Sequence, residues 1–280
     1  MTQESLEFLD SSFKKKMLRL ESELDRFLPK PSEHLSQINE AMRYSVLNGG
    51  KRIRPLLCLT VSEILGGDEN EALIPACAVE LIHSYSLIHD DLPCMDNDEL
   101  RRGKPTTHKK FGEAIALLAG DALLTLAFEC LSKLKDSKKV QRLTYEISQA
   151  AGTAGMVGGQ VMELVLDPKE IDPPTIDAIH ILKTGQLIKT SCLAGAVIAG
   201  ATPEEENHIL KFGEYLGFAF QIIDDILDGD GYLRFMSAHE ARNKAAEVIE
   251  KGKKELAGFN NSQKLTSIAD LILNRGVVKS

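Results

Sequence analysis

Hydrophobic residues recur every three or four positions along almost the whole chain. Residues 3–28 show this most plainly, with an apolar face made of Leu6, Leu9, Phe13, Met17, Leu20, Leu24 and Phe27. Such spacing is typical of an amphipathic helix. It predicts further helices over residues 33–48, 54–65, 71–91, 112–134, 138–165, 174–200, 204–228, 238–256 and 262–275. No alternation with a period of two competes with this pattern, so we expect an all-α protein.

Short breaks with turn chemistry separate these segments. They are Gly49-Gly50, Gly66-Gly67-Asp68, Asp172-Pro173-Pro174 and Thr202-Pro203. Several segments are apolar on more than one face, which indicates central helices wrapped by others. No internal repeat or low-complexity linker divides the chain. We therefore expect residues 1–280 to form a single all-α domain.

Composition narrows the range of functions. The chain has 280 residues, of which 43% are hydrophobic and 5% aromatic, with no tryptophan. This balance favours helices over a sandwich or a barrel. The net charge of -8 argues against a nucleic-acid partner, which usually requires a basic surface. It leaves room for a phosphorylated substrate, since a local basic cluster or a metal ion can dominate a site.

Compartment and membrane association are also suggested by the sequence. The five cysteines are scattered without a C-x-x-C spacing, which favours free thiols in a reducing compartment. The N-terminal MTQESLEFLD has acids where a signal peptide needs positive charge. The most apolar stretch, 114–131, is broken by Asp121 and Glu129. We expect a cytoplasmic protein without a membrane span.

Two acidic clusters follow or lie within apolar helices. The segment DDLPCMDND at residues 90–98 closes one predicted helix. Pro93 disfavours continuation of that helix, so Asp96 is expected to fold back towards Asp90. The segment QIIDDILD at residues 221–228 lies within another, where Asp224 and Asp228 share a face. Clustered carboxylates need cations nearby, and all-oxygen ligands suit magnesium.

A third motif, GGKRIRP at residues 49–55, is a glycine turn that enters a helix with three cations. Backbone N–H groups at a helix start, together with Lys and Arg, can receive a diphosphate. Each motif alone also has an ordinary explanation as a solvated helix face or a helix start. Position five of a calcium-binding loop counted from Asp96 or Asp228 would be Leu100 or Tyr232, which excludes an EF-hand. A second basic cluster, Arg101-Arg102, closely follows the first acidic segment. Together, two acidic and two basic clusters fit one site for two diphosphates.

The chain resembles the trans-prenyl diphosphate synthases of the farnesyl and geranylgeranyl type. The stretches that carry the resemblance are GGKRIRP (49–55), ELIHSYSLIHDDLPCMDNDELRRGKPTTHKKFGEAIALLAGDAL (80–123), KTGQLI (183–188) and FQIIDDILD (220–228). The similarity extends from about residue 40 to 228, and more loosely to the end. It implies an isoprenoid synthase fold: a helical bundle around a deep central cavity, working as a homodimer.

The resemblance also implies roles for individual residues. Those for isopentenyl diphosphate are Gly50, Lys51, Arg54, His83 and Arg102. Those for two magnesium ions shared with the allylic diphosphate are Asp90, Asp91 and Asp96, while Arg101 also grips that diphosphate. Asp224, with Asp225 and Asp228, would hold a third ion, and Lys183, Thr184 and Gln221 would surround the allylic group. Asp98, Glu99 and Asp121 are interpreted as structural or solvated charges.

The implied reaction joins isopentenyl diphosphate to an allylic diphosphate such as dimethylallyl or geranyl diphosphate. Magnesium and arginine would stabilise the departing diphosphate, and the apolar helices would exclude water. Tyr85 and Ser86 lie five and four positions before Asp90, deeper along the helix. The Tyr85 ring is expected to limit the chain and favour farnesyl diphosphate, although it could be an ordinary core tyrosine. A geranylgeranyl product is the alternative.

Two further alternatives and one departure from the family pattern stay open. A class I terpene cyclase shares the fold but does not need Lys51 and Arg54, and a non-catalytic synthase subunit tends to lack the acidic motifs. After Asp228 this chain runs GDGYLR, where family members usually carry a longer loop with a Lys-(Thr/Ser)-Tyr-Pro element. Either the loop has been lost, or the sequence omits a mobile segment. We favour omission.

Overall fold

The computed structural model describes residues 11–167 and 172–275, and its secondary structure is almost entirely helical. The expected helix over 3–28 is seen as α2 (Ser11–Phe27), while residues 1–10 lie outside the described part. Three further expectations agree closely with the structure: α3 (Ser36–Leu47), α4 (Ile53–Ile64) and α5 (Glu69–Asp90). Towards the C-terminus the agreement extends to α12 (Pro203–Asp228), α13 (Ala238–Glu255) and α14 (Gln263–Leu273). The all-α prediction is confirmed.

Local sequence explains where several helices begin. Thr202 caps α12 through a capping box with Glu205, and Ser237 caps α13 through a capping box with Glu240. In each box the hydroxyl and the glutamate satisfy two backbone N–H groups that the first helical turn leaves open. Asp172 accepts a hydrogen bond from the Thr175 amide and so begins α10 (Pro173–His180). These caps account for the helix starts read from the sequence.

Three elements differ from the periodic pattern. The predicted helix over 138–165 is two helices, α8 (Ser137–Ala151) and α9 (Met156–Val165). A Cβ at Gly155 would lie 2.0 Å from the Ala150 carbonyl oxygen, so the break depends on a close approach that only glycine allows. The predicted helix over 174–200 contains a π-helical turn, η1 (Ile181–Gly185), between α10 and α11 (Gln186–Ala199).

The third difference lies between α5 and α7 (Glu113–Leu131), where we expected no strand. A two-stranded antiparallel hairpin joins β1 (Leu100–Arg101) to β2 (Lys104–Pro105). The short helix α6 (Thr107–Phe111) follows it. Arg102 and Gly103 both have positive φ, 55° and 75°, as a two-residue type I′ hairpin turn requires. Such a short hairpin carries too few residues to show a period-two pattern.

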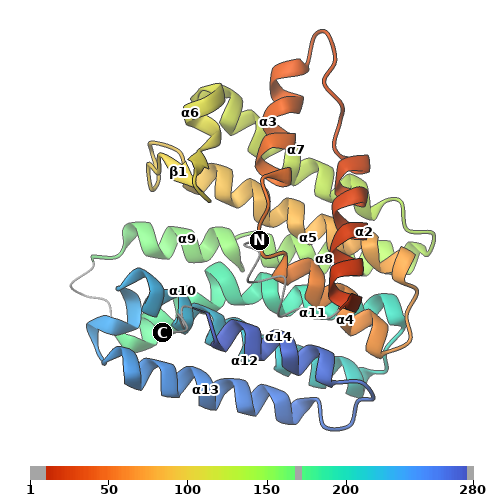
Figure 1. Cartoon of the computed structure of the whole chain (residues 1–280), viewed down its shortest axis with the longest axis vertical. Coiled ribbons are helices and arrows are strands. Elements are labelled where there is room, and N and C mark those ends of the chain that lie inside the picture. The colour runs from red at the N-terminus through yellow and green to blue at the C-terminus, as the bar shows by residue number, and fades with distance from the viewer. Residues whose placement is uncertain (1–10, 168–171, 276–280) are drawn as a thin grey trace. The chain divides into compact units, whose positions relative to one another are not determined.

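The described residues group into two compact units, with boundaries inside α4, α5 and α8. The first unit comprises residues up to Leu56 and Leu73–Val140. In it α3 packs against α2, α6 and α7 (Figure 1). Leu20, Leu24, Leu81 and Ile82 are fully buried and belong to its core. One domain over residues 1–280 stays a prediction.

The second unit comprises Leu57–Ala72 and the chain from Gln141 onwards. In it α12 packs against α11, α13 and α14 (Figure 1). Every residue of α11 from 190 to 198 is buried, so this helix is the central one that its apolar faces predicted. Helix α12 approaches α11 and η1 closely because it carries glycines at the contact. A Cβ at Gly213 or Gly217 would lie within 2.9 Å of the backbone of Lys189 or Gly185.

Two observations bear on compartment and membrane association. All five cysteines are free; four are buried, and Cys94 is exposed. Within the described residues, α5 and α7 are long and apolar enough to cross a bilayer by length and composition alone. Core helices of soluble proteins meet the same criteria, and most of the apolar stretch of α5 is buried. The absence of a membrane span stays a prediction.

Candidate active site

The first acidic motif forms a turn at the end of α5. The Asp96 amide donates a hydrogen bond to the Asp90 carbonyl oxygen at 2.9 Å, and the Asn97 amide donates to the Leu92 oxygen at 3.1 Å. The chain therefore folds back after Pro93 and brings residue 96 to the helix end, as its sequence predicted. Two of the acids proposed for one metal cluster thus lie next to each other.

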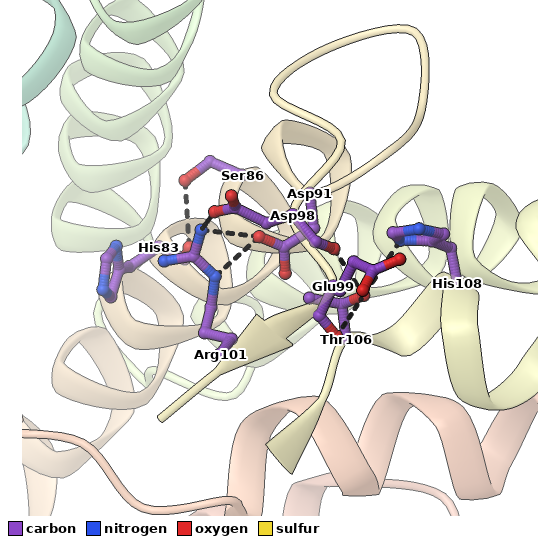
Figure 2. A network of polar contacts seen from close by, with 8 residues as sticks. All are labelled: His83, Ser86, Asp91, Asp98, Glu99, Arg101, Thr106 and His108. Atoms are coloured by element: carbon purple, nitrogen blue, oxygen red, sulfur yellow. Dashed lines mark hydrogen bonds and ion pairs between the residues drawn. The ribbon is translucent and has the colours of Figure 1, made fainter. Parts of the chain in front are cut away.

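Arg101 links this turn to the hairpin. Its guanidinium lies between two carboxylates, with Nε 2.7 Å and Nη2 2.5 Å from Asp91 Oδ1, and Nη2 3.1 Å from Asp98 Oδ2 (Figure 2). Asp91 is only 3% exposed, and burial raises the pKa of its carboxyl even with Arg101 against it. Asp98, which the sequence indicated only as a structural charge, holds the other side of Arg101.

A second layer of contacts fixes the hairpin that carries Arg101. The Thr106 hydroxyl donates to the Asp98 carbonyl oxygen at 2.8 Å and lies 3.1 Å from Nδ1 of His108 (Figure 2). Lys109 donates to the Glu99 carboxylate at 2.9 Å, and the Tyr44 hydroxyl donates to the Pro105 oxygen at 2.8 Å. Thr106 lies within the stretch that carries the resemblance, residues 80–123, but no role was predicted for it. Its contacts with Asp98 and His108 depend on the folded hairpin and could not be predicted from the sequence.

Arg102 reaches back from the hairpin to the glycine turn. Its Nη1 donates a hydrogen bond to the Gly49 carbonyl oxygen. A Cβ at Gly50 would lie 2.7 Å from the same guanidinium, and the φ of Gly50 is +130°. Glycine is therefore required at position 50 both for its backbone conformation and for the space that Arg102 fills. The structure brings together Gly50 and Arg102, which the resemblance assigned to one diphosphate.

Arg102 and three other arginines also influence His83 electrostatically. The side chain is half-buried on α5, and its pKa is lowered well below the usual value, first by burial and then by four arginines: Arg54, Arg102, Arg52 and Arg101. The ring is therefore neutral at physiological pH and can donate or accept one hydrogen bond. The positive charge around it comes from guanidinium groups, which suit the oxygens of a diphosphate.

The three cations of the glycine turn do not share one role. Lys51 is exposed, whereas Arg52 is 3% exposed. Arg52 bonds the carboxylates of Glu21 at 2.8 Å and Glu80 at 2.6 Å, and the Val46 carbonyl oxygen at 2.6 Å. It points into the first unit and is a structural cation. Arg52 was given no substrate role by the resemblance, and its contacts agree with a structural one.

Tyr85 and Ser86 precede the acidic motif on α5. The Tyr85 side chain is 6% exposed, and its ring meets the His89 ring edge-on with centroids 5.8 Å apart. His89 Nε2 lies 3.0 Å from the Leu117 carbonyl oxygen of α7. Ser86 donates its hydroxyl hydrogen to the His83 carbonyl oxygen at 2.9 Å. Tyr85 is therefore held by a histidine that is itself anchored on the neighbouring helix.

The remaining predicted residues lie in the second unit. The π-helical turn η1 carries Lys183 and Thr184, and the Lys183 ammonium pairs with Glu163. Single π-helical turns are frequent at functional sites because they shift side chains out of the regular helical register. Asp224, on α12, pairs with Arg275 at 2.5 Å. Asp228 is exposed at the last turn of the same helix.

Asp225 supports the turn after α12. Its Oδ2 accepts a hydrogen bond from the Tyr232 amide at 2.9 Å, and Oδ1 lies 3.4 Å from His180 Nε2 and 3.5 Å from the Gln221 amide nitrogen. Burial raises the pKa of Asp225 to about 7. A Cβ at Gly231 would lie 2.1 Å from the carboxylate. Residues 229–237 thus join α12 to α13 without a longer loop. Omission of a segment stays a hypothesis, as does metal binding by Asp225.

The carboxylates fit a particular kind of metal site. Within the described part of the chain, no three His, Cys, Asp or Glu side chains converge as a ready-made metal cage. Magnesium is usually held by one or two carboxylates, with water and substrate phosphates completing its shell. The adjacent Asp90 and Asp96, and separately Asp224, provide such partial, all-oxygen ligand sets. They fit an ion that binds together with a diphosphate.

Comparisons with known proteins agree with this chemistry. Residues 35–256, a range that includes parts of both units, match the polyprenyl synthetase family model. Geranylgeranyl pyrophosphate synthase 4 of Arabidopsis thaliana is 40% identical, over 96% of this chain and 84% of that protein. The heterodimeric geranylgeranyl pyrophosphate synthase large subunit 1 of the same plant is 41% identical, over 85% of this chain and 72% of that protein.

Solved structures give the same result. An apo FPP/GFPP synthase from Zymomonas mobilis matches with a TM-score of 0.91 and 37% identity, covering 96% of this chain and 99% of that one. A geranyltransferase from Legionella pneumophila matches with a TM-score of 0.87 and 31% identity, covering 99% and 100%. The fold is therefore that of the isoprenoid synthases. The chain belongs to the polyprenyl synthetase family and is a short-chain prenyltransferase that acts on isoprenoid diphosphates.

Proposed function

We propose that the chain makes farnesyl diphosphate, by adding isopentenyl diphosphate to dimethylallyl and then to geranyl diphosphate. The observation that carries this proposal is the position of Tyr85. It lies five residues before Asp90 on α5, about 7.5 Å deeper along the helix axis. Its ring is buried and fixed by His89. A rigid ring at this depth would stop a growing chain.

Each polar group has a part in the proposed reaction. The Arg102–Gly50 turn, Lys51, Arg54 and neutral His83 bind isopentenyl diphosphate, and Arg101 binds the allylic diphosphate. Asp90, Asp91 and Asp96 would hold two magnesium ions, and Asp224 with Asp225 and Asp228 would hold a third. When bound, these ions would stabilise the charge of the departing diphosphate. Arg101 adds charge-assisted hydrogen bonds to the same group. Lys183, Thr184 and Gln221 surround the allylic group, where the Gln221 side chain and the Thr184 backbone turn their dipoles towards its developing positive charge.

A twenty-carbon product is the second candidate. Relatives matched here are named as geranylgeranyl pyrophosphate synthases, and the matched Zymomonas enzyme as an FPP/GFPP synthase. Product length can differ within such a family because a single side chain in the elongation pocket changes its depth. The names therefore support the reaction class more strongly than the chain length.

Replacing Tyr85 by alanine is expected to make products longer than farnesyl diphosphate the main output. Removal of the ring opens space below the allylic chain, while Tyr85→Phe keeps the ring and should keep the farnesyl product. The measurement is chromatography of dephosphorylated products after incubation with both diphosphates and magnesium. An unchanged product distribution in Tyr85→Ala would contradict the role of this ring, and geranylgeranyl diphosphate as the wild-type product would favour the second candidate.

We also propose a cytoplasmic homodimer. Support for the dimer comes from apolar side chains that stay exposed on individual helices. Leu117 and Leu118 of α7 are 47% and 50% exposed, and Val161 and Leu164 of α9 are 50% and 54% exposed. Clusters of exposed large apolar residues often mark protein–protein contacts. Support for the cytoplasm comes from the five free cysteines, since free thiols are typical of a reducing compartment.

A further inference from the structure

Arg275, just after α14, lies over the second acidic motif. Its Nη2 is 2.5 Å from Asp224 Oδ1, and its guanidinium carbon lies 4.5 Å from the centroid of the Phe220 ring. Phe220 and Asp224 are four residues apart on α12, so they share one face of that helix. The guanidinium thus stacks on the ring and points at the carboxylate. Nothing in the sequence motifs paired this arginine with Asp224.

The backbone around Arg275 is held in place by α13. Arg242 donates to the Leu273 carbonyl oxygen at 2.9 Å and to the Arg275 carbonyl oxygen at 3.2 Å. The Arg275 amide continues the helical turn by donating to the Ile272 oxygen at 3.2 Å. These contacts cap the carbonyl groups that the end of α14 leaves open. The position of the guanidinium therefore follows from packing of three helices, α12, α13 and α14.

The contact is incomplete as a structural ion pair. The side chain of Arg275 is 15% exposed, and its Nε and Nη1 are buried without a hydrogen-bond partner among the described residues. Buried donors without acceptors destabilise the state that contains them. Arg52 offers the contrast, since it is buried with Glu21, Glu80 and the Val46 oxygen as partners. Arg275 has the features of a counter-ion that can be exchanged.

We propose that Arg275 is the resident counter-ion of Asp224, and that a divalent cation must displace it to bind that carboxylate. The proposal rests on the metal role of Asp224 given under the proposed function. A carboxylate oxygen engaged by a guanidinium is a poorer metal ligand, and the two cations repel each other at such short range. Metal binding at Asp224 is therefore weakened by the free energy needed to break the Arg275–Asp224 contact. Arg275 sets the metal concentration at which this site fills.

The test is direct binding of Mn²⁺ alone, measured by the loss of the free-ion electron paramagnetic resonance signal at constant ionic strength. Binding that disappears in Asp224→Asn defines the ion at this site. Arg275→Gln should bind that ion about threefold to tenfold more tightly, since one charge-assisted contact no longer competes. Arg142→Gln is the matched control. It removes the same charge from the same unit, and Arg142 pairs with Glu146 and Glu206 instead.

Two further results separate the inference from the assignment on which it rests. If Asp224→Asn weakens Mn²⁺ binding but Arg275→Gln binds like wild type, the counter-ion role is wrong and the metal role stands. If Asp224→Asn binds as much Mn²⁺ as wild type, the metal role itself is wrong.

A metal-free measurement checks the contact independently. In chelator, the loss of melting temperature in Arg275→Gln should shrink when Asp224 is already asparagine, because the two side chains no longer interact. Equal losses in both backgrounds would overturn the proposal. Arg275→Lys keeps the charge and should fall between wild type and Arg275→Gln in Mn²⁺ affinity.

Discussion

Turnover is expected to fall about a hundredfold to a thousandfold when Asp90 or Asp96 is replaced by alanine, the range seen when one preorganised electrostatic group is removed. The two residues meet at the end of α5, where the Asp96 amide bonds the Asp90 oxygen at 2.9 Å. Their side chains supply the carboxylates that would share magnesium with the allylic diphosphate. Asp224→Ala should have a similar effect through the third ion. The measurement is the steady-state rate with both diphosphates at saturating magnesium.

Glu99→Ala is the control for this result. Glu99 belongs to the same acidic stretch, but its exposed carboxylate pairs with Lys109 at 2.9 Å, so its loss should leave the rate near wild type. Circular dichroism should show unchanged helix content in every variant, because none of these side chains lies in the core. Near-normal rates in Asp90→Ala, Asp96→Ala and Asp224→Ala would show that the acidic motifs do not hold the metal.

Arg52→Ala is expected to lower the free energy of unfolding by about 3–5 kcal/mol, the usual result of breaking a buried ion pair from one side. Arg52 is 3% exposed, and its removal would leave Glu80, itself 2% exposed, as a buried carboxylate without this cation. Its φ of +50° is also unusual for a residue with a side chain, so the contacts hold the backbone in that conformation. Urea denaturation followed by circular dichroism measures the loss.

Lys51→Ala provides the comparison one position earlier. Lys51 is exposed, so its removal should change the free energy of unfolding by no more than about 0.5 kcal/mol. It should instead raise the Michaelis constant for isopentenyl diphosphate. Equal unfolding midpoints for Arg52→Ala and wild type would contradict the structural role given to Arg52.

Most of the fold could be predicted from hydrophobic periodicity, because helical segments longer than ten residues repeat that signal several times. The predicted elements differ from the structure where the local sequence does not report a change in the backbone. Gly155 breaks the segment at 138–165 since its α-carbon packs on the Ala150 carbonyl. The π-helical turn at Ile181–Gly185 lies between α10 and α11 without an interruption of the helical backbone, so no turn residues mark it in the sequence. The hairpin at 100–105 is too short to be recognised by alternation.

For the candidate site, the sequence predicted which residues take part, and the structure showed how some of them contact each other. The motifs identified the candidate acidic and basic residues, and the family followed from the resemblance carried by residues 49–55, 80–123, 183–188 and 220–228. The fold-back of Asp96 also followed from sequence, since Pro93 prevents the helix from continuing. The sequence showed that Gly50 belongs to a turn. It did not show that the guanidinium of Arg102, fifty-two positions further along the chain, fills the space that a side chain at position 50 would need.

What the sequence by itself determined is the list of charged groups, the helices that carry them and the reaction class. What only the tertiary structure decided is the partner of each charge. Lys51 and Arg52 are neighbours in sequence, yet one is exposed and the other is buried with Glu21 and Glu80. Asp224 and Asp225 are likewise adjacent, and one meets Arg275 while the other holds the Tyr232 amide. Charge pairing acts over a few ångströms in space, and sequence distance does not report that separation.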